Sequence, residues 1–236
     1  MEKDKLRTKI SQINEFTALI EFGNEISEII NRKIRVFCAY IDEHPFEGFI
    51  EYIPYFASVS VIYDPLKINS DFPFETIKVI LEDILSSLDF SSSDEENIVE
   101  IPVCYGGEFG PDLEYVAKIN NLNVEEVIKI HSEGKYLVYM IGFAPGFPYL
   151  GGMSEKIAAP RRESPRTVIP AGSVGIAGAQ TGVYPIETPG GWQLIGRTPI
   201  KMFDLNGEPK SLLKSGDIAK FRPISYEDYL RLKEDE

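Results

Sequence analysis

The residues that suggest chemistry gather in one stretch of the chain, Gly142–Phe203. That stretch carries six Lys or Arg and three Asp or Glu side chains, whereas the whole chain has a formal net charge of -13. Three of its arginines, Arg161, Arg162 and Arg166, fall within six residues. Because the planar guanidinium group binds carboxylates and phosphates through paired hydrogen bonds, this spacing predicts a site for a small anion or an acidic partner. The alternative is that one or two of these arginines form ion pairs with acidic residues of the same stretch. These acidic residues are Glu155, Glu163 and Glu187.

The segment Gly142–Gly152 combines glycine, proline and aromatic residues. Gly and Pro favour a non-repeating backbone, and the rings supply rigid apolar surface. The segment is therefore either a loop that lines a pocket or meets a partner, or a buried loop that plugs the domain. Its candidate residues are Phe143, Pro145, Gly146, Phe147 and Tyr149.

A second glycine-rich segment, Pro170–Gly182, matches neither the phosphate-binding loop, because no Lys follows, nor the dinucleotide fingerprint. Its small residues favour close approach of two strands or of a ligand to the backbone. Apart from Ser173, its only hydrogen-bonding side chains are Gln180 and Thr181. Trp192, the sole tryptophan, either lines a pocket or belongs to the core.

The chain has only two histidines, so a residue that transfers a proton would have to be His131, His44 or a carboxylate. His131 ends a predicted helix, where an imidazolium would also favour the helix C-terminus. The sequence shows no Ser-His-Asp ordering and no His/Cys metal cluster, so a serine hydrolase and a zinc enzyme both fit poorly. We expect no metal.

Composition narrows the class of protein. An acidic balance of 24 basic against 37 acidic residues argues against nucleic-acid binding. No run of about 18 apolar residues is present, so we expect no membrane span. The charged start of the chain lacks a secretory signal, and two cysteines cannot form a disulfide framework. These features predict a soluble, cytoplasmic protein.

The distribution of glycine and charge predicts two domains. Only Gly23 and Gly48 of the 19 glycines fall in the first hundred residues, and that part has a net charge of -11 against -2 for the remainder. The polar run Ser91–Glu96 marks the junction. We therefore expect an N-terminal α/β domain at residues 1–96 and a second domain at residues 97–236.

Hydrophobic periodicity predicts the elements of both domains. In the first, strands at Phe16–Phe22, 49–53, 59–63 and 98–104 alternate with helices at about 24–42 and from Ile77 to Leu88, which is the β-α-β-β-α-β order of a ferredoxin-like α+β domain. In the second, short helices at 112–120 and 123–132 precede a strand at 135–141. Short strands between Gly and Pro turns then predict a mainly-β barrel or sandwich.

Several motifs together resemble the KipI/PxpB family, also called allophanate hydrolase subunit 1. They cover nearly all of residues 100–204. The motifs are Cys104-Tyr-Gly-Gly-Glu-Phe-Gly-Pro-Asp-Leu113, His131, Tyr139–Gly152, Pro165-Arg166, Pro170–Gly182, Tyr184-Pro185 and Thr188–Pro199.

The resemblance implies a C-terminal cyclophilin-like β barrel and a KipA/PxpC-type partner subunit. With a PxpA-type subunit, such a pair forms an ATP-dependent 5-oxoprolinase that opens 5-oxo-L-proline to L-glutamate. ATP would be a co-substrate of the complex, since this chain has no known ATP-binding motif. The resemblance also implies two alternatives, an inhibitor of a sensor histidine kinase and a subunit related to allophanate hydrolase or carboxyltransferase.

Within the 5-oxoprolinase interpretation, several residues acquire expected roles. Arg166 and Arg197 would hold the substrate carboxylate or a phosphorylated intermediate. Gln180 and Thr181 would hydrogen-bond the lactam, and His131 would carry a proton. Trp192 remains a candidate for the substrate pocket.

Overall fold

The computed structural model of the protein describes residues 8–91 and 96–234. The chain divides into two compact units, Met1–Glu95 and Glu96–Glu236. The predicted junction Ser91–Glu96 includes residues 92–95, which lie outside the described residues.

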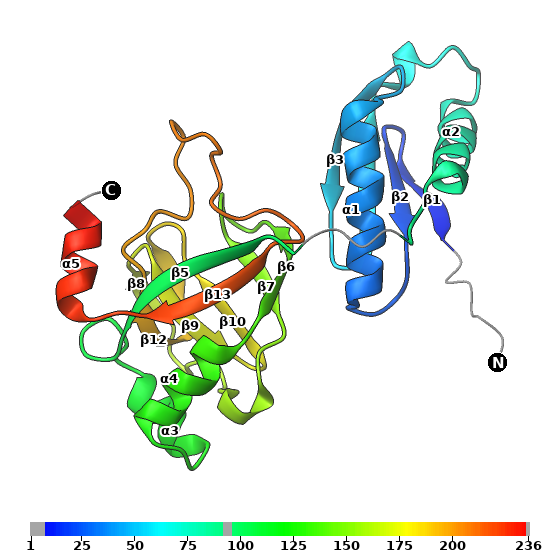
Figure 1. Ribbon diagram of the computed structural model, residues 1–236. Coiled ribbons are helices and arrows are strands. Elements are labelled where there is room, and N and C mark those ends of the chain that lie inside the picture. Colours follow the sequence, from blue (N-terminus) through cyan, green and yellow to red (C-terminus); the bar gives the residue numbers. More distant parts are fainter. Residues whose placement is uncertain (1–7, 92–95, 235–236) are drawn as a thin grey trace. The chain divides into compact units, whose positions relative to one another are not determined.

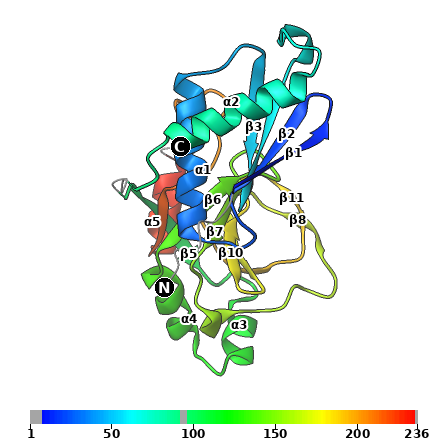
Figure 2. The same cartoon turned by 90° about the vertical axis from the view of Figure 1, so that its right-hand side faces the viewer.

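The first unit is a four-stranded antiparallel sheet with two helices on one face (Figures 1 and 2). Its elements are β1 Lys9–Asn14, β2 Thr17–Glu21, α1 Glu28–Glu43, β3 Phe49–Pro54, β4 Ser58–Tyr63, the 3₁₀ turn η1 Pro65–Lys67 and α2 Pro73–Ser87. The strand order is β1-β2-β4-β3. Ile20 and Val59 face each other across β2 and β4, and both belong to one apolar cluster with α1 and α2. This alternation leaves the other strand positions on the opposite face.

The six predicted elements occur in the predicted order along the chain, but β1 precedes them and the last strand lies in the second unit, so the first unit runs ββαββα. The additional strand β1 contains Ile10 and Ile13, whose spacing of three conceals the two-residue period of a strand. The last predicted strand, 98–104, belongs to the second unit, where it lies parallel to a strand near the end of the chain. A ferredoxin-like first domain is therefore not confirmed.

The second unit is a mixed unit built on a nearly closed, barrel-like sheet of seven strands. Its strands are β5 Ile98–Tyr105, β6 Tyr136–Ile141, β7 Pro148–Gly151, β9 Ser173–Ala177, β10 Gln180–Val183, β12 Gln193–Arg197 and β13 Ile218–Pro223, and a separate pair comprises β8 Arg166–Ile169 and β11 Thr188–Gly190. The sheet order is β10-β9-β12-β5-β13-β6-β7, and β10 also contacts β7. The β5–β13 pair is parallel, and the other pairs of this sheet whose register is described are antiparallel. The mainly-β prediction is thus confirmed at this level, and the cyclophilin-like comparison stays a prediction.

Three helices accompany this sheet in the described part of the chain: α3 Leu113–Ile119, α4 Val124–Glu133 and α5 Tyr226–Glu234, together with the 3₁₀ turn η2 Glu155–Ile157. The predicted start of α4 is confirmed, because Asn123 and Glu126 exchange the two hydrogen bonds of a capping box. The helix α4 packs on β13, whereas α3 packs on α4 and β12 (Figure 1).

The turn between β5 and α3 lies directly on β12. The Gly106 N–H donates to the Ile195 carbonyl at 3.0 Å, and the Asp112 N–H donates to the Leu194 carbonyl at 2.9 Å. Gly110 makes this approach sterically feasible, because a Cβ atom there would stand 2.1 Å from the Ile195 oxygen. The turn therefore fixes the place of Asp112 beside β12.

We expect Gly110→Ala to lower the free energy of unfolding by about 1–3 kcal/mol, the usual cost of forcing extra atoms into a packed interior. Gly191→Ala is the matched control, since its Cβ would meet no atom closer than 3.7 Å. Urea unfolding of both variants measures the difference. Equal stability of the two variants would contradict the close packing of this turn.

Candidate functional site

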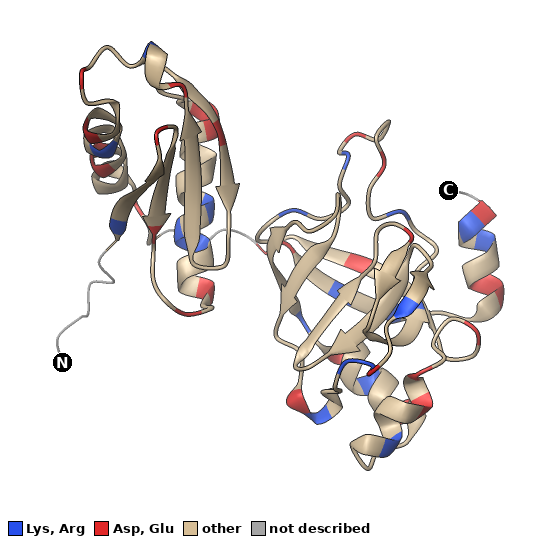
Figure 3. Cartoon of the chain, turned by 180° about the vertical axis from the view of Figure 1, so that it is seen from behind, with Lys and Arg blue, Asp and Glu red and all other residues tan. Residues whose placement is uncertain are grey.

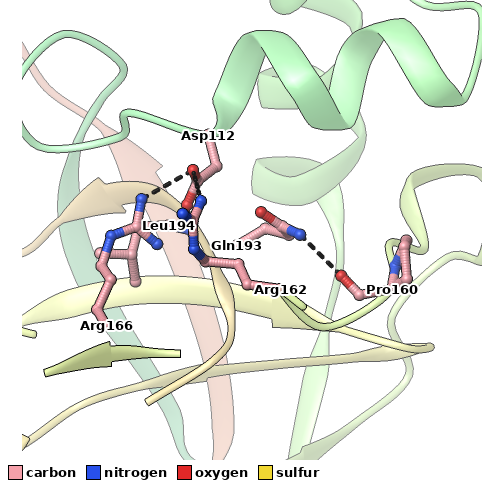
Figure 4. A network of polar contacts seen from close by, with 6 residues as sticks. All are labelled: Asp112, Pro160, Arg162, Arg166, Gln193 and Leu194. Carbon is pink, nitrogen blue, oxygen red and sulfur yellow. Dashed lines mark hydrogen bonds and ion pairs between the residues drawn. The ribbon is translucent and has the colours of Figure 1, made fainter. Parts of the chain in front are cut away.

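The second unit contains a buried carboxylate, that of Asp112, to which two arginines bind (Figure 4). Its Oδ1 accepts hydrogen bonds from Arg166 Nη2 at 2.8 Å and from Arg162 Nη1 at 3.1 Å. Its Oδ2 accepts the Leu194 N–H at 2.7 Å. Asp112 stands at the N-cap position of α3, yet its side chain makes no capping hydrogen bond. The carboxylate is thus used to connect the turn, β12 and the two arginines.

The segment that carries the arginines is tied to the β12 region at two further points. The side-chain amide of Gln193 donates to the Pro160 carbonyl at 2.8 Å, and the Arg162 N–H donates to the Gly191 carbonyl at 2.8 Å. The bond from Gln193 to Pro160 is drawn in Figure 4, and the two bonds together flank the short path from Pro160 to Arg162. The segment is therefore held by its backbone as well as by Asp112.

The predicted cationic patch is thus partly neutralised, but by a residue to which the sequence assigned no role. Among the described residues, Arg162 and Arg166 form no ion pair with the acidic residues of their own stretch. Their partner Asp112 lies in the motif 104–113, far from the arginines in sequence. The excess of six Lys or Arg over three Glu in Gly142–Phe203 was the one signal in the sequence that could have prompted a search for a distant acidic partner.

The balance of charge at this cluster is unequal. One carboxylate faces two guanidinium groups, and Arg166 Nη1 and Arg162 Nε are buried without a hydrogen-bond partner. The side chains of Arg162 and Arg166 nevertheless expose 36% and 22% of their surface. The pair is therefore a cationic site that retains unused donors and partial access to solvent. Over the whole second unit, charges of both signs occur (Figure 3).

An aromatic cluster lies beside the arginine segment. The rings of Phe147, Tyr184 and Trp192 stand edge to face, with centroids 6.0–6.1 Å apart. Burial raises the pKa of the Tyr184 phenol, and the Trp192 backbone, Arg161 and Arg166 act in the opposite direction. Tyr184 thus lies within the electrostatic reach of the cationic segment. Sequence reasoning gave Tyr184 no role of its own.

Gly142–Gly152 separates into a packed part and an exposed part. Phe147 is buried and Tyr149 half-buried, and the centroids of their rings lie 5.4 Å apart. Phe143 exposes 73% of its surface and has a φ of 65°, a left-handed conformation that is rare for a non-glycine residue. The exposed Pro145 precedes Gly146, which is buried with a φ of 80°. The segment is therefore neither wholly a buried plug nor wholly an exposed loop.

His131, the candidate proton carrier, is completely buried. Its Nδ1 lies 2.7 Å from Tyr105 Oη, and its Nε2 lies 2.8 Å from Thr181 Oγ1. Because Thr181 Oγ1 donates to the Gly175 carbonyl, it accepts the Nε2 proton, and Nδ1 then accepts from Tyr105. Burial lowers the pKa of His131 to about 3. The imidazole is therefore neutral and fully bonded, a geometry that gives it a structural role; proton transfer stays a prediction.

The remaining candidates are not brought together with Arg166 by any contact described in the structure. Thr181 is buried in the His131 chain, whereas Gln180 is exposed at the start of β10. The Arg197 guanidinium lies 4.9 Å from the centre of the Phe109 ring and bonds to Tyr229 of α5. A direct role of these three side chains in substrate binding stays a prediction.

The described residues hold neither a metal cluster nor a membrane span. Within 8–91 and 96–234, no group of three His, Cys, Asp or Glu side chains has the geometry of a metal site. Among the same residues, no helix is both long and apolar enough to cross a membrane.

Comparison with known proteins identifies the family. Residues 8–213 match the family described as carboxyltransferase domain, subdomain C and D. The chain belongs to this carboxyltransferase C/D family. A relative, the B subunit of 5-oxoprolinase from Bacillus subtilis (strain 168), is 55% identical over 236 residues, which cover 98% of each chain. The predicted resemblance to the KipI/PxpB group is thereby confirmed.

Solved structures of similar proteins share this fold. A conserved uncharacterized protein of Pyrococcus horikoshii is 46% identical, and the match covers 94% of this chain and 100% of that one with a TM-score of 0.55. The protein TTHA0988 is 32% identical with a TM-score of 0.76 over 89% of this chain and 40% of its own. The fold thus recurs as one part of a longer chain.

The buried His131 predicts a pH dependence of stability. The pKa of this imidazole is about 3 in the fold, against 6.5 for an unperturbed histidine side chain, so the folded state binds fewer protons. Its stabilisation is complete above pH 6.5 and is lost as the pH falls toward 3. Between pH 7.5 and pH 5 we expect the free energy of unfolding to fall by about 2 kcal/mol from this group.

Denaturant unfolding at both pH values measures this loss. In His131→Gln the contribution disappears, whereas His44→Gln, which removes the exposed second histidine, retains it. The same pH slope in the wild-type protein and in His131→Gln would refute the buried neutral imidazole.

The loop geometry gives a second prediction. A Cβ at position 146 would stand 2.7 Å from Phe203 Cβ, and the backbone there has a positive φ. We expect Gly146→Ala to lower the melting temperature by several degrees, corresponding to about 1–3 kcal/mol. Gly142→Ala, whose Cβ would lie 3.6 Å from the Tyr149 ring, serves as the control from the same loop. A thermal melt in which the two variants coincide would contradict this assignment.

Proposed function

We propose that this chain is the B subunit of an ATP-dependent 5-oxoprolinase, which opens 5-oxo-L-proline to L-glutamate. The observation that carries the proposal is the 55% identity with the B subunit of a 5-oxoprolinase over nearly the full length of both chains. The complex would also contain a KipA/PxpC-type subunit and a PxpA-type subunit. This chain would have no activity alone.

The described site is compatible with a shared active centre. Opening a stable lactam requires activation of its carbonyl, and phosphorylation of that oxygen by ATP supplies such activation. The sequence contains no known ATP-binding motif, so we assign nucleotide binding to another subunit. The contribution of this chain would be to bind and orient the substrate, because its paired arginines suit a carboxylate.

The exposed Phe143 supports a role for the loop 142–147 at a subunit contact. An aromatic side chain with 73% of its surface exposed on a strained backbone is uncommon, and such strain persists where the surroundings or function require it. The neighbouring Phe147 is packed inward and supports the loop. A partner that covers Phe143 would remove this apolar surface from water.

The test is reconstitution from purified subunits. With 5-oxoproline and ATP as substrates, we expect glutamate formation only when this chain is present together with its two partner subunits. The chain by itself should release no glutamate above the uncatalysed background. Allophanate in place of 5-oxoproline is the control for the alternative that the complex acts on a ureido substrate.

A glutamate yield that does not change when this chain is omitted would rule out the proposed function. Turnover of allophanate in preference to 5-oxoproline would reassign the substrate. Inhibition of a sensor histidine kinase at stoichiometric ratio, without any effect on glutamate formation, would favour the regulatory alternative.

A further inference from the structure

The cluster around Asp112 has a feature that ordinary ion pairing does not explain. Asp112 is buried and both its oxygens are engaged, since Oδ1 accepts from both arginines and Oδ2 accepts from Leu194. A single negative charge cannot neutralise two guanidinium groups. The pair of arginines therefore carries one uncompensated positive charge next to the barrel-like sheet.

The unused hydrogen-bond donors are found in the same place. Arg166 Nη1 and Arg162 Nε are buried and lack a partner. A buried donor without a partner is costly, so two on neighbouring side chains are unusual. Since both oxygens of Asp112 are already engaged, an additional oxyanion at the exposed part of the two side chains is the group that would balance the charge.

We propose that Asp112 is a positioning residue that holds Arg162 and Arg166 together as a binding site for the carboxylate of a small lactam substrate. One monoanionic carboxylate matches the single uncompensated charge of the pair. The partial exposure of both arginine side chains gives such a ligand access to the exposed part of each side chain, whereas Arg162 Nε and Arg166 Nη1 remain buried. Only the identity of the lactam rests on the function proposed above.

The geometry indicates how Asp112 acts. Its backbone and its Oδ2 are both bound to Leu194, so its Oδ1 has a fixed position relative to β12. Each arginine donates from one terminal nitrogen to that oxygen. Because a guanidinium group is planar, this hydrogen bond also fixes the direction of its other N–H donors. Without Asp112, the two like charges would repel each other and the side chains would separate.

The first experiment measures steady-state kinetics of the reconstituted complex with Asp112→Asn. We expect the KM for 5-oxoproline to rise at least ~10-fold, which corresponds to about 1.4 kcal/mol, while the kcat per folded molecule and the KM for ATP change less than about 2-fold. The matched control is Asp217→Asn. Asp217 is also a buried carboxylate, bound to Asn97 and to the Lys214 N–H, and its replacement should lower stability without changing KM.

Asp112→Asn removes a buried charge and could therefore prevent folding. A second variant keeps the proposal testable in that case. Arg162→Lys keeps the charge but loses the planar fork, and we expect a rise of about 3- to 10-fold in the KM for 5-oxoproline. Arg222→Lys is its control, since Arg222 lies on β13 and pairs with Glu100 at the surface. An unchanged KM in both Asp112→Asn and Arg162→Lys overturns the proposal. A rise in the KM for ATP alone overturns the carboxylate assignment.

The second experiment separates this inference from the proposed function. Calorimetric titration of the purified chain compares 5-oxo-L-proline with 2-pyrrolidinone, the same lactam without its carboxylate. We expect binding of the first only, and its loss in Arg162→Lys. Carboxylate-dependent binding by a chain that supports no glutamate formation would overturn the function and keep the site. An active complex whose chain binds both lactams equally would keep the function and overturn the site.

Discussion

The arrangement of the candidate site depends on one interaction, the attachment of the Asp112 carboxylate and backbone to Leu194 on β12. Two hydrogen bonds of opposite direction join these residues, at 2.9 Å and 2.7 Å. They fix the turn after β5 against β12 and fix the start of α3. The same carboxylate also binds Arg162 and Arg166. The sheet, through Asp112, therefore determines where the two arginines lie. Removing one partner of such a buried pair leaves an uncompensated charge, which is usually strongly destabilising.

A second buried polar chain stabilises another part of the unit. It runs from Tyr105 on β5 through His131 on α4 to Thr181 on β10, and every member has a hydrogen-bond partner. The centroid of the His131 ring also lies 4.4 Å from that of the Phe221 ring of β13. Satisfied polar groups of this kind specify a unique arrangement of the elements that they join. The network of His131 thus holds α4 in place, whereas the network of Asp112 positions the two arginines.

How far the sequence predicts this structure depends on whether the information is local. The capping box of α4 and the strand at 135–141 were predicted because a few neighbouring residues determine them. The strand β1 and the place of β5 were not, since β1 lacks clear alternation and β5 pairs with β13 from the far end of the chain. The basic stretch was found from composition, but its partner Asp112 lies 50 residues from Arg162 in sequence. No local pattern reveals such a pairing.

The same distinction applies to the candidate residues. Residue type alone made His131 a natural proton carrier, whereas its complete burial and its two partners follow from the packing of α4 on the sheet. Arg197 was grouped with Arg166 by charge, and the fold instead places its guanidinium against Phe109. The residues that share a site are therefore determined by the strand order, which the sequence alone did not provide.

Arg162 and Arg166 are proposed to form the carboxylate site of this protein, and side-chain NMR tests that central claim most directly. In the purified, isotope-labelled protein, titration with 5-oxo-L-proline should shift the guanidinium resonances of Arg162 and Arg166 together, with one saturation curve. Those of Arg197 and Arg222 should remain unchanged. Shifts confined to Arg197, or the absence of any shift at Arg162 and Arg166 when the ligand is saturating, would contradict the account.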